Sequence, residues 1–196
     1  MAVTLTEYQP KVLQYFTELK ETVSILDSMP IAEAIAALQE ARLQERRIFV
    51  MGNGGSATTA SHFVCDLAKN TRHPDAAPFK IIGLSDNMGL ITAYANDEGY
   101  ENVFAQQMAN LLQANDVVVA ISTSGNSANV VKAVEMANEA GALTIGLTGF
   151  NAGKLGNMVN LHLHVPSDCI EQVEDIHLIL THLIVKTLKE KVSEGK

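Results

Sequence analysis

Five short apolar runs alternate with longer amphipathic stretches over most of this chain. The runs cover residues 48–51, 79–84, 117–121, 143–147 and 161–165. Continuous apolar runs of this length are typical of strands that are buried on both faces of a parallel sheet. Because these strands alternate with stretches that suit helices, the pattern predicts an α/β doubly wound fold.

Helical periodicity precedes the first of these runs and follows the last. Two helices are expected before residue 46, because apolar residues recur there at spacings of three and four. The apolar positions are Val12, Tyr15, Phe16, Leu19, Val23 and Leu26 in the first helix, and Ile31, Ile35 and Leu38 in the second. A long helix is expected over residues 170–191. No linker interrupts the sequence, so residues 1–196 are predicted to form a single domain, with residues 1–46 as a helical extension.

The charge balance argues against nucleic acid as a partner. The formal net charge is −8, the pI is about 5.2, and no cluster of lysine and arginine stands out. No uninterrupted apolar run of about 18 residues is present, so no membrane partner is predicted and a cytoplasmic protein is expected. A phosphorylated small molecule is compatible with this balance, because backbone N–H groups can hold phosphate without a net positive charge.

A glycine-rich turn follows the first apolar run. Residues 52–56 read Gly-Asn-Gly-Gly-Ser, and residues 57–69 suit a helix. Glycine permits positive φ and the close approach of a ligand to the backbone, and Ser56 is expected to cap the helix. The N-terminus of such a helix offers free N–H groups and a favourable dipole to an anion.

A second turn, rich in hydroxyl groups, follows the third apolar run. Residues 122–127 read Ser-Thr-Ser-Gly-Asn-Ser and precede a helix expected over residues 128–140. Hydroxyls and backbone amides together can surround a phosphate without any cation, and Gly125 allows the turn. The alternative is that both turns are ordinary connections between strand and helix, where Gly and Ser are common.

Two such turns at the carboxyl ends of parallel strands line a single ligand crevice, and this weakens the alternative. Neither turn has the GxGxxG or the Walker A pattern, so no nucleotide cofactor is expected. The sequence therefore predicts that a phosphorylated small molecule binds between residues 52–56 and residues 122–127.

Two pairs of titratable side chains recur at helical spacing. His62 and Asp66 are four residues apart, and Glu174 and His182 are eight apart on the last helix, so each pair shares one helical face. Two imidazoles and two carboxylates can bind a transition metal, or can act as general acids and bases in proton transfer. The alternative is that these are solvated or structural residues, because the sequence cannot show that the two helices meet.

Two further polar pairs have simpler interpretations. Asn96 and Asp97 are by themselves compatible with a plain turn. His162 and His164 alternate along the expected fifth strand and therefore share one of its sides. They can bind a metal, but an edge strand with one polar face is the favoured interpretation.

Several motifs in combination resemble a known family. The motifs are the first turn with His62-Phe63, then Asn96-Asp97, the stretch from Ile121 through the second turn to Ala133, and Leu147-Thr148-Gly149. Over nearly its whole length the chain is similar to the sugar isomerase (SIS) domain proteins of the phosphoheptose isomerase group. The resemblance implies a flavodoxin-like three-layer sandwich, in which a five-stranded parallel sheet has helices on both faces. It also implies a homotetramer with sites where subunits meet, in which residues 1–46 pack in the oligomer.

The resemblance also implies roles for individual residues. His62, Asp66, Glu174 and His182 match the zinc ligands of the group, and Asp66 and His182 match its catalytic base and acid. The group has Glu in place of Asp66 and Gln in place of Glu174, so two positions depart from the pattern. Asp66 is shorter by one methylene, and the added charge of Glu174 can tighten a metal but repels an enediolate. The implied substrate contacts are Asn53, Gly54, Gly55, Ser56, Asn96, Asp97, Ser122, Thr123, Ser124, Ser127 and Glu174.

Two functions are compatible with these features, and a purely structural tetramer with a vestigial pocket is a third alternative. The first is an isomerase of a ketose phosphate such as sedoheptulose 7-phosphate, with phosphate on residues 122–127, Asp66 or Glu174 as base and His182 as acid. Zinc or another divalent transition metal is the cofactor that such a site can take. The second is a non-catalytic sugar-phosphate sensor or adaptor of the kind that associates with a replication initiator. Such proteins lack the catalytic carboxylate, and they also lack the histidine of the last helix. This chain keeps titratable groups at both positions, which favours an enzyme over a sensor or adaptor.

Overall fold

The computed structural model describes residues 5–194 and contains a five-stranded parallel sheet. The strands are β1 (Arg47–Gly52), β2 (Lys80–Gly83), β3 (Val117–Ile121), β4 (Leu143–Thr148) and β5 (Leu161–His164). Their order across the sheet is β2-β1-β3-β4-β5, which is the order of flavodoxin-like folds. All five predicted strands are confirmed to within one residue at each end.

The register of the sheet brings the carboxyl ends of three strands to one edge. Gly52 at the end of β1 pairs with Ile121 at the end of β3, and Ile121 pairs in turn with Leu147 of β4. The connections after these strands therefore leave the sheet side by side, where open α/β sheets bind their ligands.

The helices predicted before β1, after β1 and β3, and after β5 are present, and two further helices lie in addition between β2 and β3. They are α1 (Leu5–Ser24), α2 (Ser28–Leu43), α3 (Gly55–Asn70), α4 (Met88–Glu98), α5 (Ala105–Ala109), α6 (Ala128–Glu139) and α7 (Ile170–Glu194), with two short 3-10 turns, η1 (Tyr100–Asn102) and η2 (Leu155–Asn157). Two helices precede β1 and one long helix follows β5, as predicted. Among the residues described, none of these helices has the length and apolar content needed to cross a membrane.

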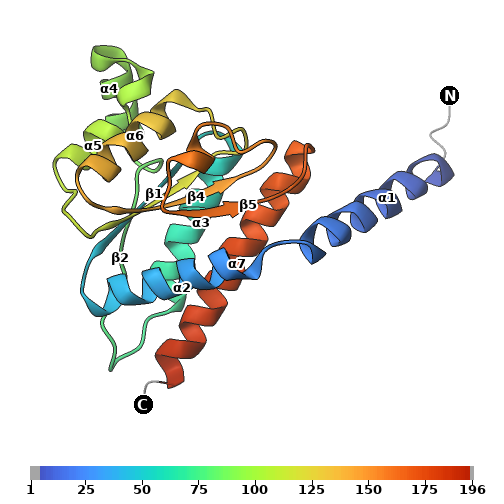
Figure 1. Cartoon of the computed structure of the whole chain (residues 1–196), viewed down its shortest axis with the longest axis horizontal. Helices are drawn as coiled ribbons and strands as arrows, with labels where there is room; N and C mark the ends of the chain where they lie inside the picture. Colours follow the sequence, from blue (N-terminus) through green and yellow to red (C-terminus); the bar gives the residue numbers. More distant parts are fainter. Residues whose placement is uncertain (1–4, 195–196) are drawn as a thin grey trace.

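Alternate side chains of the central strands enter two separate cores. Ile48 and Val50 of β1 pack in one core, and Phe49 and Met51 pack in the other, all with 0% exposure. The first core lies under α2, α3 and α7, and the second lies under α4, α5 and α6 (Figure 1). Because each face of the sheet is covered by helices, both faces of the strands must be apolar, which confirms the predicted three-layer architecture.

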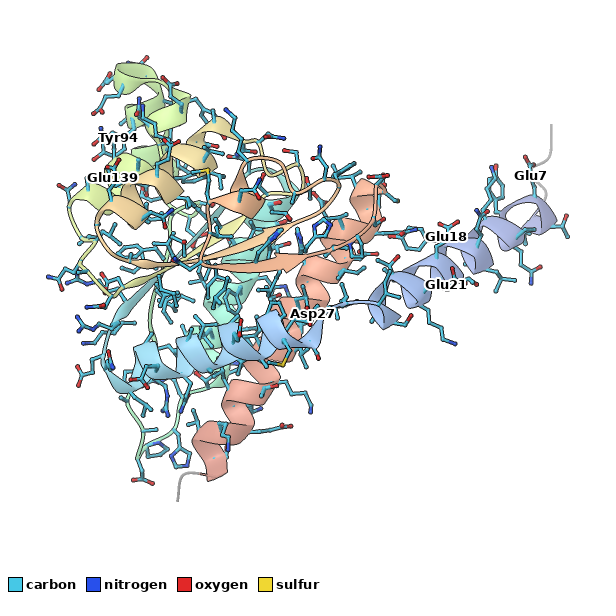
Figure 2. All side chains as sticks on the ribbon, viewed as in Figure 1. Glu7, Glu18, Glu21, Asp27, Tyr94 and Glu139 are labelled. Atoms are coloured by element: carbon cyan, nitrogen blue, oxygen red, sulfur yellow. The ribbon has the colours of Figure 1, made fainter. Side chains whose placement is uncertain are left out.

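The first helix, α1, projects from this body (Figure 1). None of its described residues is buried, and its exposed apolar side chains are Leu5, Tyr8, Val12, Leu13, Phe16 and Val23. The Tyr15 hydroxyl donates to Oδ2 of Asp175 at 2.6 Å, and this bond raises the pKa of Tyr15. Figure 2 shows Glu7, Glu18 and Glu21 along the same helix. An apolar helix face that is exposed instead of packed against a core is typical of an interaction surface.

Candidate active site

The first loop, residues 52–56, follows β1 and passes directly into α3. Gly54 has a φ of 53°, a left-handed conformation that favours glycine, and α3 begins at Gly55. The expectation that Ser56 caps this helix is therefore wrong. Ser56 lies inside the first turn and is only 5% exposed. The glycine itself turns the chain into the helix, so no side-chain cap is required.

The second loop, residues 122–127, follows β3 and places several hydroxyl groups at the start of α6. Ser122 is buried, and its Oγ lies 3.3 Å from Oγ of Ser127, the residue that precedes the helix. The Ser127 side chain makes no capping bond, so its hydroxyl faces Ser122 and not the helix backbone. The first N–H groups of a helix have no carbonyl partner within it, and the helix dipole favours an anion there. The loop therefore combines hydroxyls and amides in the way that phosphate binding requires.

The connection after β4 supports this second loop. Gly125 has a φ of +64°, and a Cβ there would come within 1.9 Å of the Ala152 carbonyl oxygen. The N–H of Leu155 donates to the Gly125 carbonyl at 3.0 Å, and the N–H of Gly149 donates to the Thr123 carbonyl at 2.9 Å. Residues 149–155 thus hold the shape of the loop, and no spacing in the sequence pointed to this support.

Two asparagines join the first loop to the first turn of α6. Asn53 donates to Oδ1 of Asn129 at 2.8 Å, and Asn129 donates to Oδ1 of Asn53 at 2.9 Å. The hydroxyl of Tyr100, in η1, donates to the same Asn53 oxygen at 2.9 Å. Asn129 is only 2% exposed, and neither it nor Tyr100 was among the predicted site residues. The one available signal was a polar side chain on the buried face of the predicted helix 128–140.

The residues after β2 support the first loop and α3. Oγ of Ser85 accepts the N–H of Gly52 at 3.3 Å and donates to the Gly52 carbonyl at 2.9 Å. Asp86 accepts a hydrogen bond from Ser61 of α3, and the side-chain oxygen of Asn87 caps α4. These residues therefore act through the backbone and the helices around the site.

Two histidines and one aspartate meet between α3 and α7. Nε2 of His62 lies 3.4 Å from Oδ2 of Asp66, and Nε2 of His182 lies 3.7 Å from the same oxygen. The two Nε2 atoms are 3.3 Å apart. This convergence, which the helical spacings alone could not establish, arises because α3 and α7 pack against the same face of the sheet.

The chemistry of this cluster fits a divalent transition metal. His62, Asp66 and His182 each offer one ligand atom, and these atoms all lie within 4.8 Å of one another. Two imidazoles and a carboxylate suit zinc and similar ions, and three protein ligands leave a position for substrate. Asn70 donates to Oδ1 of Asp66 at 3.0 Å, a bond of the kind that orients a ligating carboxylate.

Glu174 lies apart from this cluster, against the first loop. A Cβ on Gly55 would come within 2.5 Å of each of the two Glu174 carboxylate oxygens. This carboxylate therefore sits at the N-terminus of α3, where the helix dipole favours a negative charge. The structure brings together three of the four predicted metal ligands and places the fourth beside the predicted substrate contacts.

Three further histidines contact Thr148 of β4, one from α7 and two from β5. His177 is 1% exposed, and its Nε2 lies 3.2 Å from the carbonyl oxygen of Thr148. Burial lowers the pKa of His177 to about 4, and the hydrogen bond to Thr148 opposes this only in part. His162 and His164 contact the Thr148 hydroxyl from β5, at 2.7 and 3.3 Å. Because β5 is the edge of the sheet, the favoured interpretation of this pair is confirmed.

Asn96 and Asp97 lie in the last turn of α4, so their interpretation as a plain turn is wrong. Both are exposed, and Asn96 donates to Oδ1 of Asp97 at 2.7 Å. Within residues 5–194, no side-chain hydrogen bond joins either residue to the two loops. Gly99, with a φ of 92°, follows the helix and leads to Tyr100, which does contact the first loop.

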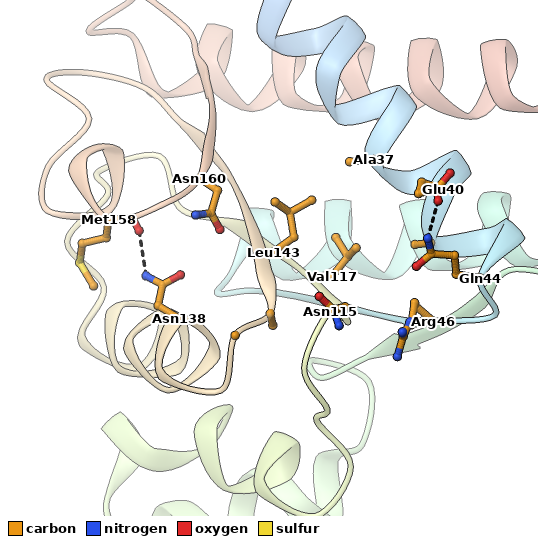
Figure 3. Close-up of a pocket in the computed structure, with 13 residues that line it drawn as sticks. Ala37, Glu40, Gln44, Arg46, Asn115, Val117, Asn138, Leu143, Met158 and Asn160 are labelled. Atoms are coloured by element: carbon orange, nitrogen blue, oxygen red, sulfur yellow. Dashed lines mark hydrogen bonds between the residues drawn. The ribbon is translucent and has the colours of Figure 1, made fainter.

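A separate cavity of about 550 Å³ opens at the opposite, amino edge of the sheet (Figure 3). Arg46, Asn115, Asn138 and Asn160 are among its lining residues. Asn138 already donates to the Met158 carbonyl at 2.8 Å. Since the two loops and the N-termini of α3 and α6 lie at the carboxyl ends of the strands, we place the site there and not in this cavity.

Comparison with known proteins gives one consistent result. The SIS domain model matches residues 8–149. The phosphoheptose isomerase of Helicobacter pylori (strain P12) is 36% identical over 176 residues, which cover 90% of this chain and 91% of that protein. The phosphoheptose isomerase of Bordetella avium (strain 197N) is 39% identical over 160 residues, which cover 80% of this chain and 81% of that protein. The solved structure of a phosphoheptose isomerase from Francisella tularensis matches with a TM-score of 0.85 at 31% identity, covering 96% of this chain and 100% of that one.

The sheet order and the position of the site thus define a SIS-domain α/β protein. Within that class, the chain belongs to the phosphoheptose isomerase family, because relatives above 30% identity match it over most of both chains. The resemblance inferred from the turn and helix motifs is confirmed. The expectation of an isomerase, in place of a non-catalytic adaptor, is confirmed at the level of the family.

Proposed function

We propose that this protein interconverts a ketose phosphate and the corresponding aldose phosphate, with sedoheptulose 7-phosphate as the leading substrate. The observation that carries the proposal is the convergence of His62, Asp66 and His182 within one chain, on helices that adjoin the loops. The names of the relatives support the choice of a heptose phosphate.

The spacing between the loops and the cluster suits a long substrate. His62 is seven residues beyond Gly55, which corresponds to about 10 Å along α3. In an extended heptose phosphate, the phosphate and the carbonyl are at opposite ends of the carbon chain. A sugar that extends from the first loop along α3 can bring its carbonyl end to the cluster while its phosphate stays on the second loop.

Proton transfer is assigned to side chains of this chain. Aldose–ketose isomerisation moves one proton between adjacent carbons and another between their oxygens. Asp66 or Glu174 is the proposed base at carbon, and His182 is the proposed acid at oxygen. Because Asp66 and His182 are 3.7 Å apart, one carbon–oxygen pair of a substrate can contact both.

The proposed metal ligands are His62, Asp66 and His182, with Glu174 as the predicted fourth. Zinc is the leading ion, and a bound divalent metal supplies Lewis-acid polarisation of the carbonyl. The short side chain of Asp66 is compatible with this role, because its oxygen lies 3.4 and 3.7 Å from the two imidazole nitrogens. The position of Glu174 against Gly55 favours a role toward the substrate.

The proposed substrate contacts divide between the loops. Phosphate is assigned to the second loop and the sugar to the first loop, beside Glu174. The contacts are Asn53, Gly54, Gly55 and Ser56 in the first group and Ser122, Thr123, Ser124 and Ser127 in the second. Asn96 and Asp97 stay predictions, because their place on α4 supports no direct contact with either loop.

We further propose a homotetramer in which residues 1–46, as an extension of the single domain 1–196, pack against neighbouring subunits. The exposed apolar face of α1 supports this, and so do Ile179 and Leu183 on α7, which are 40% and 44% exposed. His182 lies between these two in sequence and is itself exposed, so a subunit that covers α7 also closes the cluster. No nucleic acid or membrane partner is expected, and the location is expected to be cytoplasmic.

A coupled assay with ketose phosphates of increasing chain length, with and without added zinc, tests the isomerase proposal. We expect turnover of the heptose phosphate, loss of that turnover in His182→Gln, and retention of it in the matched variant His73→Gln. Failure of every ketose phosphate to react, with and without zinc, would exclude the isomerase. A sugar phosphate that still raised the melting temperature in that case would favour the sensor or adaptor.

A further inference from the structure

The hydrogen bonds between Asn53 and Asn129 are compatible with only one orientation of the Asn53 amide. The backbone N–H of Val130 donates to Oδ1 of Asn129 at 3.0 Å. A backbone N–H is always a donor, so this atom of Asn129 must be the oxygen. The Asn53 atom that lies 2.8 Å from the same oxygen must then be the amide nitrogen, and the other terminal atom of Asn53 must be its oxygen.

This orientation also determines the direction of the bond from Tyr100. Oδ1 of Asn53 accepts from Nδ2 of Asn129 and from the Tyr100 hydroxyl, both at 2.9 Å, so both of its lone pairs are used. One N–H of the Asn53 amide is bonded to Asn129. In the described part of the chain, no acceptor is bonded to the second N–H. Asn53 is therefore a side chain with a filled acceptor and one available donor.

We propose that Asn129 and Tyr100 are positioning residues that hold Asn53 as a hydrogen-bond donor to an oxygen of the bound sugar phosphate. The inference rests on the proposed binding of a sugar phosphate between the loops and defines how one contact in that site works. Without its two partners the amide can rotate, and it then presents its oxygen to the hydroxyl and carbonyl oxygens of the sugar. A fixed donor removes that competing orientation before the substrate binds.

The network joins parts of the structure with different degrees of burial. Asn129 is buried in the first turn of α6 with 2% exposure, whereas Tyr100 is 55% exposed. Gly99 precedes Tyr100 with a φ of 92°, so the chain turns sharply between α4 and η1. Among the described residues, the Tyr100 hydroxyl is the side-chain group that joins η1 to Asn53.

Two variants isolate this role, and a third serves as control. Tyr100→Phe removes only the hydroxyl, and Asn129→Asp keeps the acceptor for Val130 but has no N–H for the Asn53 oxygen. For each we expect KM for the heptose phosphate to rise about 3- to 10-fold, with kcat changed less than about twofold, as suits the loss of one hydrogen bond. The matched control is Tyr94→Phe, which removes a hydroxyl from α4 at the position shown in Figure 2 and leaves KM unchanged.

Further measurements separate positioning from a structural role. Tyr100→Phe should leave the melting temperature and the inhibition by inorganic phosphate unchanged, because the phosphate loop is intact. In an Asn53→Ala background, Tyr100→Phe should have no additional effect, since it acts through Asn53. An unchanged KM in both variants overturns the inference. So does a weaker affinity for inorganic phosphate in Tyr100→Phe that parallels the rise in KM.

Direct binding decides the inference independently of catalysis. The same variants are compared with the wild type by calorimetry, with sedoheptulose 7-phosphate as the probe. We expect the dissociation constant of each variant to be about 3- to 10-fold higher. If the wild-type chain binds this probe without turnover, the isomerase proposal fails and the binding comparison still tests the network. A wild-type chain that binds no sugar phosphate overturns both.

Discussion

Nε2 of His182 lies 3.7 Å from Oδ2 of Asp66. The two residues are far apart in the sequence, because α3 follows the first strand of the chain and α7 follows the last. His62 contacts the same carboxylate oxygen at 3.4 Å. One carboxylate therefore faces both imidazoles. If these groups hold a metal, Asp66 contributes both a ligand and the negative charge that balances the cation.

Replacement of Asp66 by Asn is expected to lower the affinity for zinc by about 100-fold or more, because even the partners that merely orient metal ligands contribute 10- to 100-fold. Isomerase activity should fall with it. Zinc titration by calorimetry measures the change. Asp75→Asn, at an exposed aspartate beside His73, is the matched control. Equal zinc affinity in wild type and Asp66→Asn would remove Asp66 from the ligand set.

Gly125 and Gly141 both have positive φ, at +64° and +73°, but only Gly125 has a close neighbour. A Cβ at Gly125 would lie 1.9 Å from the Ala152 carbonyl oxygen, whereas one at Gly141 would meet only Cβ of Ala114 at 3.8 Å. We expect Gly141→Ala to lower the free energy of unfolding by about 1 kcal/mol. Gly125→Ala should lower it by about 3 kcal/mol, because backbone must also move.

Urea unfolding at one fixed protein concentration compares the two glycine variants. Gly125→Ala should in addition weaken binding of the sugar phosphate, since Gly125 shapes the proposed phosphate loop. Similar losses of stability in the two variants would contradict the close contact between residues 125 and 152.

His177 is expected to make the stability depend on pH. Burial lowers its pKa to about 4 from an ordinary value of about 6.5. Since the unfolded chain takes up this proton at higher pH than the folded chain does, the contribution is complete above about pH 6.5 and declines as pH falls toward 4. At pH 4.5 the free energy of unfolding should be lower by about 2 kcal/mol from this group alone.

Urea unfolding of the wild type and His177→Gln at pH 7.5 and 4.5 checks this contribution. We expect a smaller difference between the two pH values in the variant, and an unchanged difference in His73→Gln. The same pH dependence in wild type and His177→Gln would show that His177 is not the buried neutral group that the structure describes.

Phe16 on α1 is 62% exposed and belongs to the apolar face proposed to pack in the tetramer. Phe16→Asp is expected to dissociate the assembly, because a charge there must be desolvated when subunits meet. Sedimentation velocity should show a smaller species, with lower isomerase activity if the neighbouring subunit closes the site. Lys11→Ser is the control on the same helix. A wild-type-like mass for Phe16→Asp would remove this face from the interface.

Parts of the site could be predicted wherever the signal is local. The turn at residues 122–127 was recognisable because glycine and hydroxyl residues between a strand and a helix have a local structural meaning. Ser56 was misassigned because Gly54 takes a left-handed conformation and turns the chain itself. Asn129 and Tyr100 were missed because their role depends on contacts with Asn53 that no sequence spacing encodes.

The sequence by itself determined the strands, the helices and the two loops, because apolar periodicity and turn chemistry act over a few neighbouring residues. The tertiary structure alone decided that His62 and Asp66 meet His182, while Glu174 lies at Gly55. It also decided the orientation of the Asn53 amide. These outcomes depend on how elements distant in the chain pack together, and the distances between their side chains are set only by that packing.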